Sequence, residues 1–211
     1  MNSSDKACKS TLRHHQDQIP FSPIFTRLEK ALESGAVVLA IDGGSGSGKT
    51  TLSKALSDIY DCNVIHMDDF FLRPEQRTPE RYAEAGGNVD RERFYDEVLI
   101  PLGKGDAIEY RRFDCATMTL SPTMKIDPKK LTVIEGAYSM HPCFTEFYSL
   151  TVFLDIAPNV QRARINKRNT PEMAQRFFNE WIPLEERYFA EMQVKERCDV
   201  VVEITENKTA E

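Results

Sequence analysis

The stretch IDGGSGSGKTT, residues 41–51, places four glycines and two serines directly ahead of a lysine. Ordering a glycine costs roughly 0.5–1 kcal/mol relative to alanine, so such a run is either a flexible linker or a backbone held close to a ligand. The flanking residues distinguish these interpretations. The apolar run AVVLA, residues 36–40, precedes the stretch and is typical of a buried strand. Leu52, Leu56 and Ile59 follow it at helical spacing, so the glycines connect a strand to a helix.

The same stretch completes the pattern G-x-x-x-x-G-K-[ST] of the Walker A motif, which we call the phosphate loop (residues 43–50). Backbone N–H groups and the start of the following helix together favour an anion there. Lys49 is expected to reach the terminal phosphates of ATP, and the Thr50 hydroxyl is expected to bind Mg²⁺. The predicted cofactors are therefore ATP and Mg²⁺. The predicted nucleotide-binding residues are Gly43, Gly44, Ser45, Gly46, Ser47, Gly48, Lys49, Thr50 and Thr51.

The composition is that of an ordinary water-soluble protein, with 211 residues of which 41% are hydrophobic and 28% are charged. A net charge of −6 gives no general attraction for nucleic acid or for an anionic membrane. No window approaches a membrane span, and the N-terminus lacks the apolar core of a signal peptide, so a cytoplasmic location is expected. We expect the partner to be a small-molecule substrate with a hydroxyl acceptor, and we expect no binding to nucleic acid or to a membrane. Assembly into a homo-oligomer is compatible with the sequence.

Five short runs rich in β-branched residues predict strands, at residues 36–41, 63–67, 131–136, 150–155 and 199–204. Helical or irregular stretches separate them, which favours an α/β fold with a five-stranded parallel sheet and helices on both faces. Ligands of such sheets bind at the carboxyl ends of the strands. A polar extension and a predicted helix at 22–35 make up residues 1–36, and the main domain is expected at 37–211.

The alternation of strands and helices breaks at residues 70–130. Phe94, Val98 and Leu102 predict one helix there, and residues 107–120 predict a small hairpin. Long irregular segments in compact domains are usually functional, so this segment is interpreted as a substrate-binding insert.

Acidic residues follow two of the predicted strands. Asp68 and Asp69 come after the second strand, and Glu135 lies at the end of the third. Carboxylates at this edge of the sheet can bind Mg²⁺ or accept a proton from an attacking hydroxyl. The simpler alternatives are surface acids for the aspartates and a turn cap for Glu135. We expect the metal ligands to be Thr50, Glu135 and Asp68.

The segment RARINKRN, residues 162–169, concentrates four positive charges in an acidic chain. Arg164 and Arg168 are one helical turn apart and can neutralise charge on a transferring phosphoryl group. A solvated basic helix face is the alternative. The end of the segment, NKRN, lacks the last residue of the guanine-reading pattern N-K-x-D, which argues against a GTPase.

These motifs, taken in order with the strand ends DDFF and VIEG, resemble the uridine kinase and phosphoribulokinase family of P-loop kinases. The resemblance covers residues 37–204, and DDFF with the insert after it is also similar to nicotinamide riboside kinases. It implies a P-loop NTPase-type fold and transfer of the ATP γ-phosphate to a hydroxyl of a small molecule. It also implies a mobile arginine-rich lid at about 158–172.

The resemblance assigns roles to single residues. Asp68 matches the catalytic base, Glu135 matches the acid near Mg²⁺, and Asp90 matches an acid that hydrogen-bonds ribose hydroxyls. The expected catalytic residues are Asp68, Lys49, Arg164 and Arg168.

The chain departs from uridine kinases where those enzymes read the base. Phe113 and Met118 stand in place of two polar base-contacting residues, so the edge of a pyrimidine would lose two partners. Arg111 and Arg112 favour an anionic acceptor, or are simply exposed hairpin arginines. The expected substrate-binding residues are Asp68, Asp90, Arg112 and Phe113.

A uridine kinase-like nucleoside kinase is the leading expectation for the function. The alternatives are a kinase of another hydroxylated metabolite, such as a sugar phosphate, a pantothenate-like acid or nicotinamide riboside, and a non-catalytic nucleotide-binding regulator.

Overall fold

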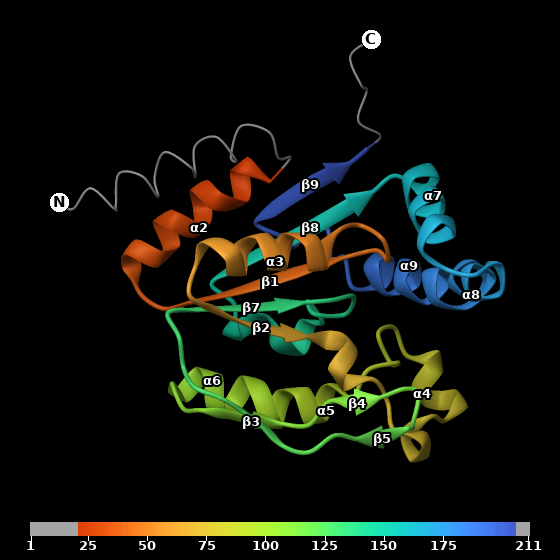
Figure 1. The fold of residues 1–211 in the computed structure, drawn as a ribbon, viewed down its shortest axis with the longest axis horizontal. Coiled ribbons are helices and arrows are strands. Elements are labelled where there is room, and N and C mark those ends of the chain that lie inside the picture. Colours follow the sequence, from red (N-terminus) through yellow and green to blue (C-terminus); the bar gives the residue numbers. More distant parts are fainter. Residues whose placement is uncertain (1–20, 206–211) are drawn as a thin grey trace, which may run out of the picture.

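Five parallel strands form the central sheet of the computed structural model, in which residues 21–205 are described. Their order across the sheet is β2-β7-β1-β8-β9 (Figure 1). The bounds are Val37–Gly43 for β1, Cys62–His66 for β2, Leu131–Glu135 for β7, Leu150–Ile156 for β8 and Val200–Ile204 for β9. The predicted α/β fold with a five-stranded parallel sheet is thereby confirmed.

The strand register brings the predicted site residues to one edge of the sheet. Glu135 at the end of β7 pairs with Ile41 of β1 on one side and with His66 of β2 on the other. The phosphate loop begins where β1 ends, and Asp68 follows β2 within the short 3-10 turn η1 (Met67–Phe70). The loop and both predicted acids therefore lie at the carboxyl end of the sheet, where ligands of such folds bind.

The two faces of the sheet build two separate cores, because successive side chains of a strand point to opposite faces. Leu39 and Ile41 belong to one core, and Ala40 between them belongs to the other. Helices α2 (Ser22–Ser34) and α3 (Lys49–Ile59) cover the first face. The second core is covered by helical segments at 91–104 and by α9 (Ile182–Glu191), so the helices lie on both faces (Figure 1).

Helix α2 is the helix expected at residues 22–35. Pro23 lies in its first turn, where the missing N–H of proline costs nothing. Ile24, Phe25 and Leu28 from this helix are buried in the same core as the sheet residues. Residues 1–20, the predicted polar extension, lie outside the described residues.

The insert at 70–130 packs below the second core in Figure 1. A continuous helical run, α5 (Arg91–Phe94), η3 (Tyr95–Leu99) and α6 (Ile100–Lys104), is the helix expected from its apolar spacing. The predicted hairpin at 107–120 is only partly correct. β4 (Phe113–Asp114) pairs with β5 (Thr119–Leu120), but β3 (Ile108–Tyr110) pairs instead with β6 (Met124–Ile126). The remaining insert elements are η2 (Pro74–Gln76) and α4 (Pro79–Ala83).

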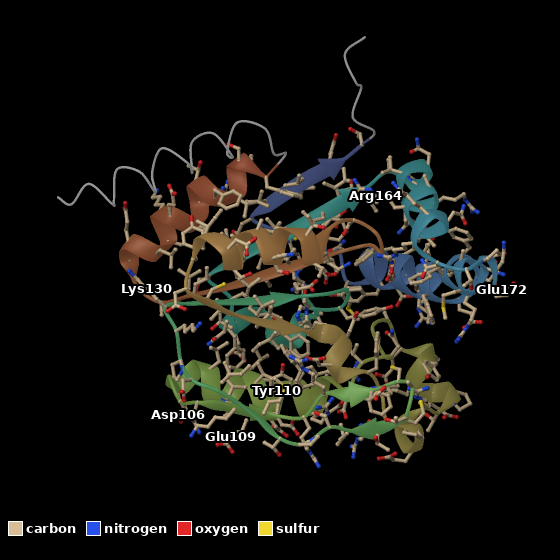
Figure 2. All side chains as sticks on the ribbon, in the orientation of Figure 1. Asp106, Glu109, Tyr110, Lys130, Arg164 and Glu172 are labelled. Carbon is tan, nitrogen blue, oxygen red and sulfur yellow. The ribbon has the colours of Figure 1, made fainter. Side chains whose placement is uncertain are left out.

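The segment predicted to form the lid, at about 158–172, contains α7 (Pro158–Arg168) and the start of α8 (Pro171–Arg176), and η5 (Phe177–Trp181) follows it. The 3-10 helix η4 (Pro142–Phe147) lies earlier in the chain. Ile165, Ala174 and Ile182 form a small third core here, apart from the two cores of the sheet. Figure 2 shows Glu172 at the outer end of the lid and Tyr110 within the insert. None of the helices among residues 21–205 is both long and apolar enough to cross a membrane.

Candidate active site

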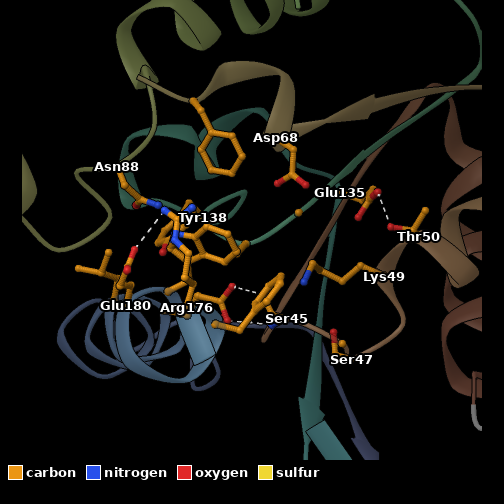
Figure 3. Close-up of a pocket in the computed structure, with 18 of the residues that line it drawn as sticks. Ser45, Ser47, Lys49, Thr50, Asp68, Asn88, Glu135, Tyr138, Arg176 and Glu180 are labelled. Carbon is orange, nitrogen blue, oxygen red and sulfur yellow. Dashed lines mark hydrogen bonds and ion pairs between the residues drawn. The ribbon is translucent and has the colours of Figure 1, made fainter. Parts of the chain in front are cut away.

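A cavity of about 1320 Å³ lies between the phosphate loop, the lid and the insert. Of the predicted site residues, those that line it are Ser45, Gly46, Ser47, Gly48, Lys49, Thr50, Thr51, Asp68, Glu135, Arg164 and Arg168. Residues that are far apart in the sequence thus meet in one space. Figure 3 shows Lys49, Asp68 and Glu135 close to one another in this cavity.

The phosphate loop has the geometry that its glycines predict. A Cβ on Gly43 would lie 2.5 Å from the Leu154 carbonyl oxygen of β8, so only glycine fits where the loop leaves the sheet. Gly48 has φ +106°, a left-handed conformation that glycine adopts without strain, and α3 begins directly after it. The first N–H groups of that helix have no acceptor within it, which suits an anion.

Two polar groups of the loop are suited to phosphate. The Lys49 ammonium donates to the carbonyl oxygens of Gly43 at 2.6 Å and Gly44 at 3.1 Å, which holds it over the loop. The Ser47 hydroxyl is buried and has no hydrogen-bond partner among the described residues. A lysine over the loop and an unsatisfied hydroxyl within it fit a polyphosphate ligand.

The oxygen donors expected to hold Mg²⁺ lie beside this loop. The Thr50 hydroxyl donates to Oε1 of Glu135 at 3.1 Å, and Asp68 lines the same cavity (Figure 3). No cluster of three or more His, Cys, Asp or Glu side chains among residues 21–205 could hold a metal ion by itself. This donor set fits Mg²⁺, which is usually held by one or two carboxylates together with substrate phosphates.

His66 is an additional partner of Glu135. Its Nδ1 lies 2.6 Å from Oε1 of Glu135, and this hydrogen bond raises the pKa of His66 above its usual 6.5. Since a carboxylate only accepts, His66 donates. This contact was not predicted from the sequence; it follows from the strand register, which places His66 and Glu135 side by side.

Asp68 and Asp69 have different surroundings although they are adjacent. Asp68 is accessible from the cavity, but the protein around its carboxylate excludes part of the water, which raises the pKa of Asp68 above 3.8; the positive charge of Lys49 opposes this shift. Asp69 does not line the cavity. It accepts a hydrogen bond from the Tyr110 hydroxyl at 3.1 Å and pairs with Arg112 at 3.3 Å. Of the two, only Asp68 lines the cavity.

The two lid arginines take different positions. Nη1 of Arg164 donates to the carbonyl oxygens of Gly46 at 3.0 Å and Ser47 at 3.3 Å. The guanidinium of Arg168 lies 5.3 Å from the centre of the Phe177 ring and lines the cavity. Arg164 therefore contacts the loop itself, whereas Arg168 borders the space above it.

Three predicted substrate-binding residues do not line the cavity: Asp90, Arg112 and Phe113. Asp90 is 1% exposed; it caps α5 by accepting from the Arg93 N–H at 3.2 Å and lies near the guanidinium groups of Arg73 and Arg93. Phe113 is 5% exposed and packs beside Arg77. In this structure all three make their contacts within the insert and η1.

Other residues, not foreseen from the sequence, also line the cavity. Asn88, Arg77 and Tyr138 are among them. Tyr138 has φ +75°, which is uncommon for a residue other than glycine. Such strained backbone conformations are concentrated at functional sites. Its place three residues after Glu135 was the only signal available in the sequence. Glu185, which reaches the phosphate loop from α9, gave no signal because 140 residues separate it from its partner Ser45.

Comparison with known proteins gives results consistent with this geometry. A model of the phosphoribulokinase / uridine kinase family matches residues 38–177, more than half of the chain. A phosphoribulokinase from Synechocystis sp. is 29% identical over 151 residues, which cover 66% of this chain and only 43% of that protein. A uridine kinase from Staphylococcus epidermidis is 24% identical over 182 residues, which cover 78% of this chain and 86% of that protein.

Solved structures include a similar fold. The structure of a possible uridine kinase from Bacillus stearothermophilus covers 83% of this chain and 99% of its own, with 24% identity and a TM-score of 0.62. At this identity the likeness concerns the fold.

Proposed function

Because this chain belongs to the phosphoribulokinase / uridine kinase family, we propose that it transfers the γ-phosphate of ATP to a hydroxyl of a small molecule, with a nucleoside as the leading acceptor. One observation carries the proposal. The phosphate loop with Lys49 and the carboxylate of Asp68, which is accessible from the cavity, line one cavity that is large enough for two ligands. Known ligand pockets are commonly about 300–1,000 Å³, so a cavity of about 1320 Å³ has room for a nucleotide and an acceptor.

The proposed mechanism is in-line transfer. The loop N–H groups and Lys49 hold the phosphates, and Asp68 accepts the proton of the attacking hydroxyl. Desolvation of its carboxylate raises the pKa of Asp68, which makes it a stronger base than an aspartate fully surrounded by water. When bound, Mg²⁺ would neutralise charge on the phosphates, held by Thr50, Glu135 and Asp68.

The lid and the insert complete the proposed site. Arg168 borders the cavity and is free to approach the transferring group when the lid closes, because the lid has its own small core. The insert at about 70–130 supplies the acceptor side through Arg77 and Asn88. Asp90 and Arg112, the predicted contacts to the acceptor, would need the insert to rearrange before they reach it.

Three candidates remain for what the bound nucleotide serves: transfer to a nucleoside, transfer to an anionic metabolite, and regulation without transfer. The uridine kinase from Staphylococcus epidermidis, matched over most of its length, favours a nucleoside. The Synechocystis phosphoribulokinase and Arg77 in the cavity wall favour a phosphorylated or otherwise anionic metabolite. A nucleotide-binding regulator is the third candidate. Asp68 beside the loop favours an enzyme over a regulator, because a regulator needs no base.

The proposal is tested by incubating the full chain with ATP, Mg²⁺ and a panel of nucleosides, sugar phosphates and vitamins, with products identified by mass spectrometry. Uridine or cytidine monophosphate supports the leading acceptor. A phosphorylated product outside the nucleosides replaces it with the second candidate. ATP binding without a phosphorylated product from any member of the panel favours the regulator.

A further inference from the structure

Glu185 of α9 binds the phosphate loop with both oxygens of its carboxylate. Oε2 accepts the Ser45 N–H at 2.8 Å, and Oε1 accepts the Ser45 hydroxyl at 2.6 Å. Glu185 is only 5% exposed, so both bonds are sheltered from water. Hydrogen bonds to an ionised carboxylate are roughly twice as strong as neutral ones. Ser45, the second variable position of the Walker A motif, is therefore held in place against α9.

A second contact from α9 holds the strand that leads into the loop. The Tyr188 hydroxyl donates to Oδ2 of Asp42 at 2.9 Å, and Asp42 is the residue just before Gly43. Tyr188 lies three residues after Glu185, so both side chains project from one face of the helix. Asp42 also accepts from the N–H groups of Gly43 at 2.7 Å and Met140 at 3.0 Å. The start of the loop is thus anchored to the same helix.

Helix α7 also holds the loop. Nε2 of Gln161 donates to the Ser45 carbonyl at 3.0 Å, and Arg164 donates to the carbonyls of Gly46 and Ser47. In a planar trans peptide the carbonyl of one residue and the N–H of the next point in opposite directions. The N–H groups of Gly46 and Gly48 consequently point away from α7.

From these contacts we propose that Glu185 is a positioning residue: by holding Ser45 it keeps the neighbouring N–H groups of the phosphate loop oriented toward the β-phosphate of the nucleotide. The assignment rests on the proposed function, since it concerns the same nucleotide site. It adds a link to the lid, because α9 follows η5 directly in the chain. The packing position of α9 and the backbone conformation of the phosphate loop then depend on each other.

The test measures binding of MgADP and of AMP by calorimetry, without an acceptor, on the full chain and on E185A, E185Q and S45A. Glu186→Gln is the matched control, because Glu186 is the exposed neighbour on the same helix. AMP lacks the β-phosphate, so it reports on the nucleotide site without the group that the loop is proposed to hold. A residue that only stabilises the fold would change the affinity for both nucleotides together.

We expect E185A to weaken MgADP binding about tenfold, as expected for lost hydrogen bonds to a charged group, with little change for AMP. E185Q should recover most of the affinity, because its amide can still accept from the Ser45 N–H. In the E185A background, Ser45→Ala should have no further effect. Unchanged MgADP binding by E185A, or equal losses for MgADP and AMP, would overturn the assignment. Failure of the wild-type chain to bind MgADP would instead remove the proposed function, and the assignment with it.

Discussion

Asp68→Asn is the substitution that most sharply tests the proposed chemistry. Asparagine keeps the size of the side chain and most of its hydrogen bonds but cannot accept a proton. Asp68 lines the cavity, is accessible from it, and has Lys49 as the nearby opposite charge. We propose that it accepts the proton of the acceptor hydroxyl. General base catalysis is usually worth about 10²–10⁴ in rate, which is roughly 3–5 kcal/mol of barrier. We expect kcat to fall by that factor. MgADP affinity should fall much less, because Asp68 is only one of three proposed metal ligands and the phosphate loop still holds the phosphates.

Asp69→Asn is the matched control, because the structure gives Asp69 another task. Its carboxylate accepts from Tyr110 and pairs with Arg112, whose side chain is 49% exposed. An exposed pair of this kind contributes about 0–1 kcal/mol, and an asparagine oxygen can still accept from Tyr110. We therefore expect kcat within about threefold of the wild-type value, as for a residue outside the chemistry.

The assay follows acceptor-dependent ADP formation, with MgADP affinity measured in parallel. The pH profile adds a second readout. Asp68 must be ionised to act as the base, so kcat/KM should fall as the pH drops through its pKa, which desolvation raises above 3.8. D68N should lose this acid limb. A larger kcat loss in D69N than in D68N would refute the reasoning, and so would a loss of MgADP affinity in D68N as large as its loss of kcat.

Three further predictions use other parts of the site. Lys49→Ala should abolish turnover, because it removes the cation held over the loop, while circular dichroism and the melting temperature show an intact fold; near-normal kcat would contradict this. Arg168→Ala should lower kcat more than MgADP affinity, whereas Arg164→Ala should lower both, because Arg164 binds the loop carbonyls. Kinetics measure kcat and calorimetry measures MgADP affinity. The same pattern of losses in both variants would be inconsistent with the structure. Burial raises the pKa of Asp42 from 3.8 to about 6, so the folded protein holds this proton more tightly than the unfolded chain and loses stability as the pH rises from about 4 to 6. The unfolding free energy of the wild-type chain relative to D42N, from urea titrations, should therefore fall by about 3 kcal/mol across that range, and a flat difference would show that Asp42 does not titrate in this way.

The sheet and the phosphate loop could be predicted because their signals are local. Buried parallel strands are continuous apolar runs, and the glycines of the loop are required by the close approach of β8 to Gly43. Asp68 and Glu135 could be placed near the loop because both follow strands of one parallel sheet. In each case a few consecutive residues carry the information.

The rest of the site depends on contacts between distant segments. Glu185 and Ser45 are 140 residues apart, and their pairing follows from how α9 packs on the sheet. Tyr188 of the same helix is fully buried, as an apolar helix face leads one to expect, but no local pattern singles out Glu185. The pairing of β3 with β6 was missed for a related reason: the nearer hairpin, β4 with β5, lies between them.

The central claim is that a hydroxyl of a small molecule, rather than water, receives the γ-phosphate. The most direct measurement uses ATP labelled with ¹⁸O in its γ-phosphoryl group, together with the acceptor panel and Mg²⁺, and follows the label by mass spectrometry. The account predicts that the label appears in a phosphate ester of one acceptor, at a rate that falls about 10²-fold or more in D68N. Label found only in inorganic phosphate, whichever acceptor is present, would contradict it.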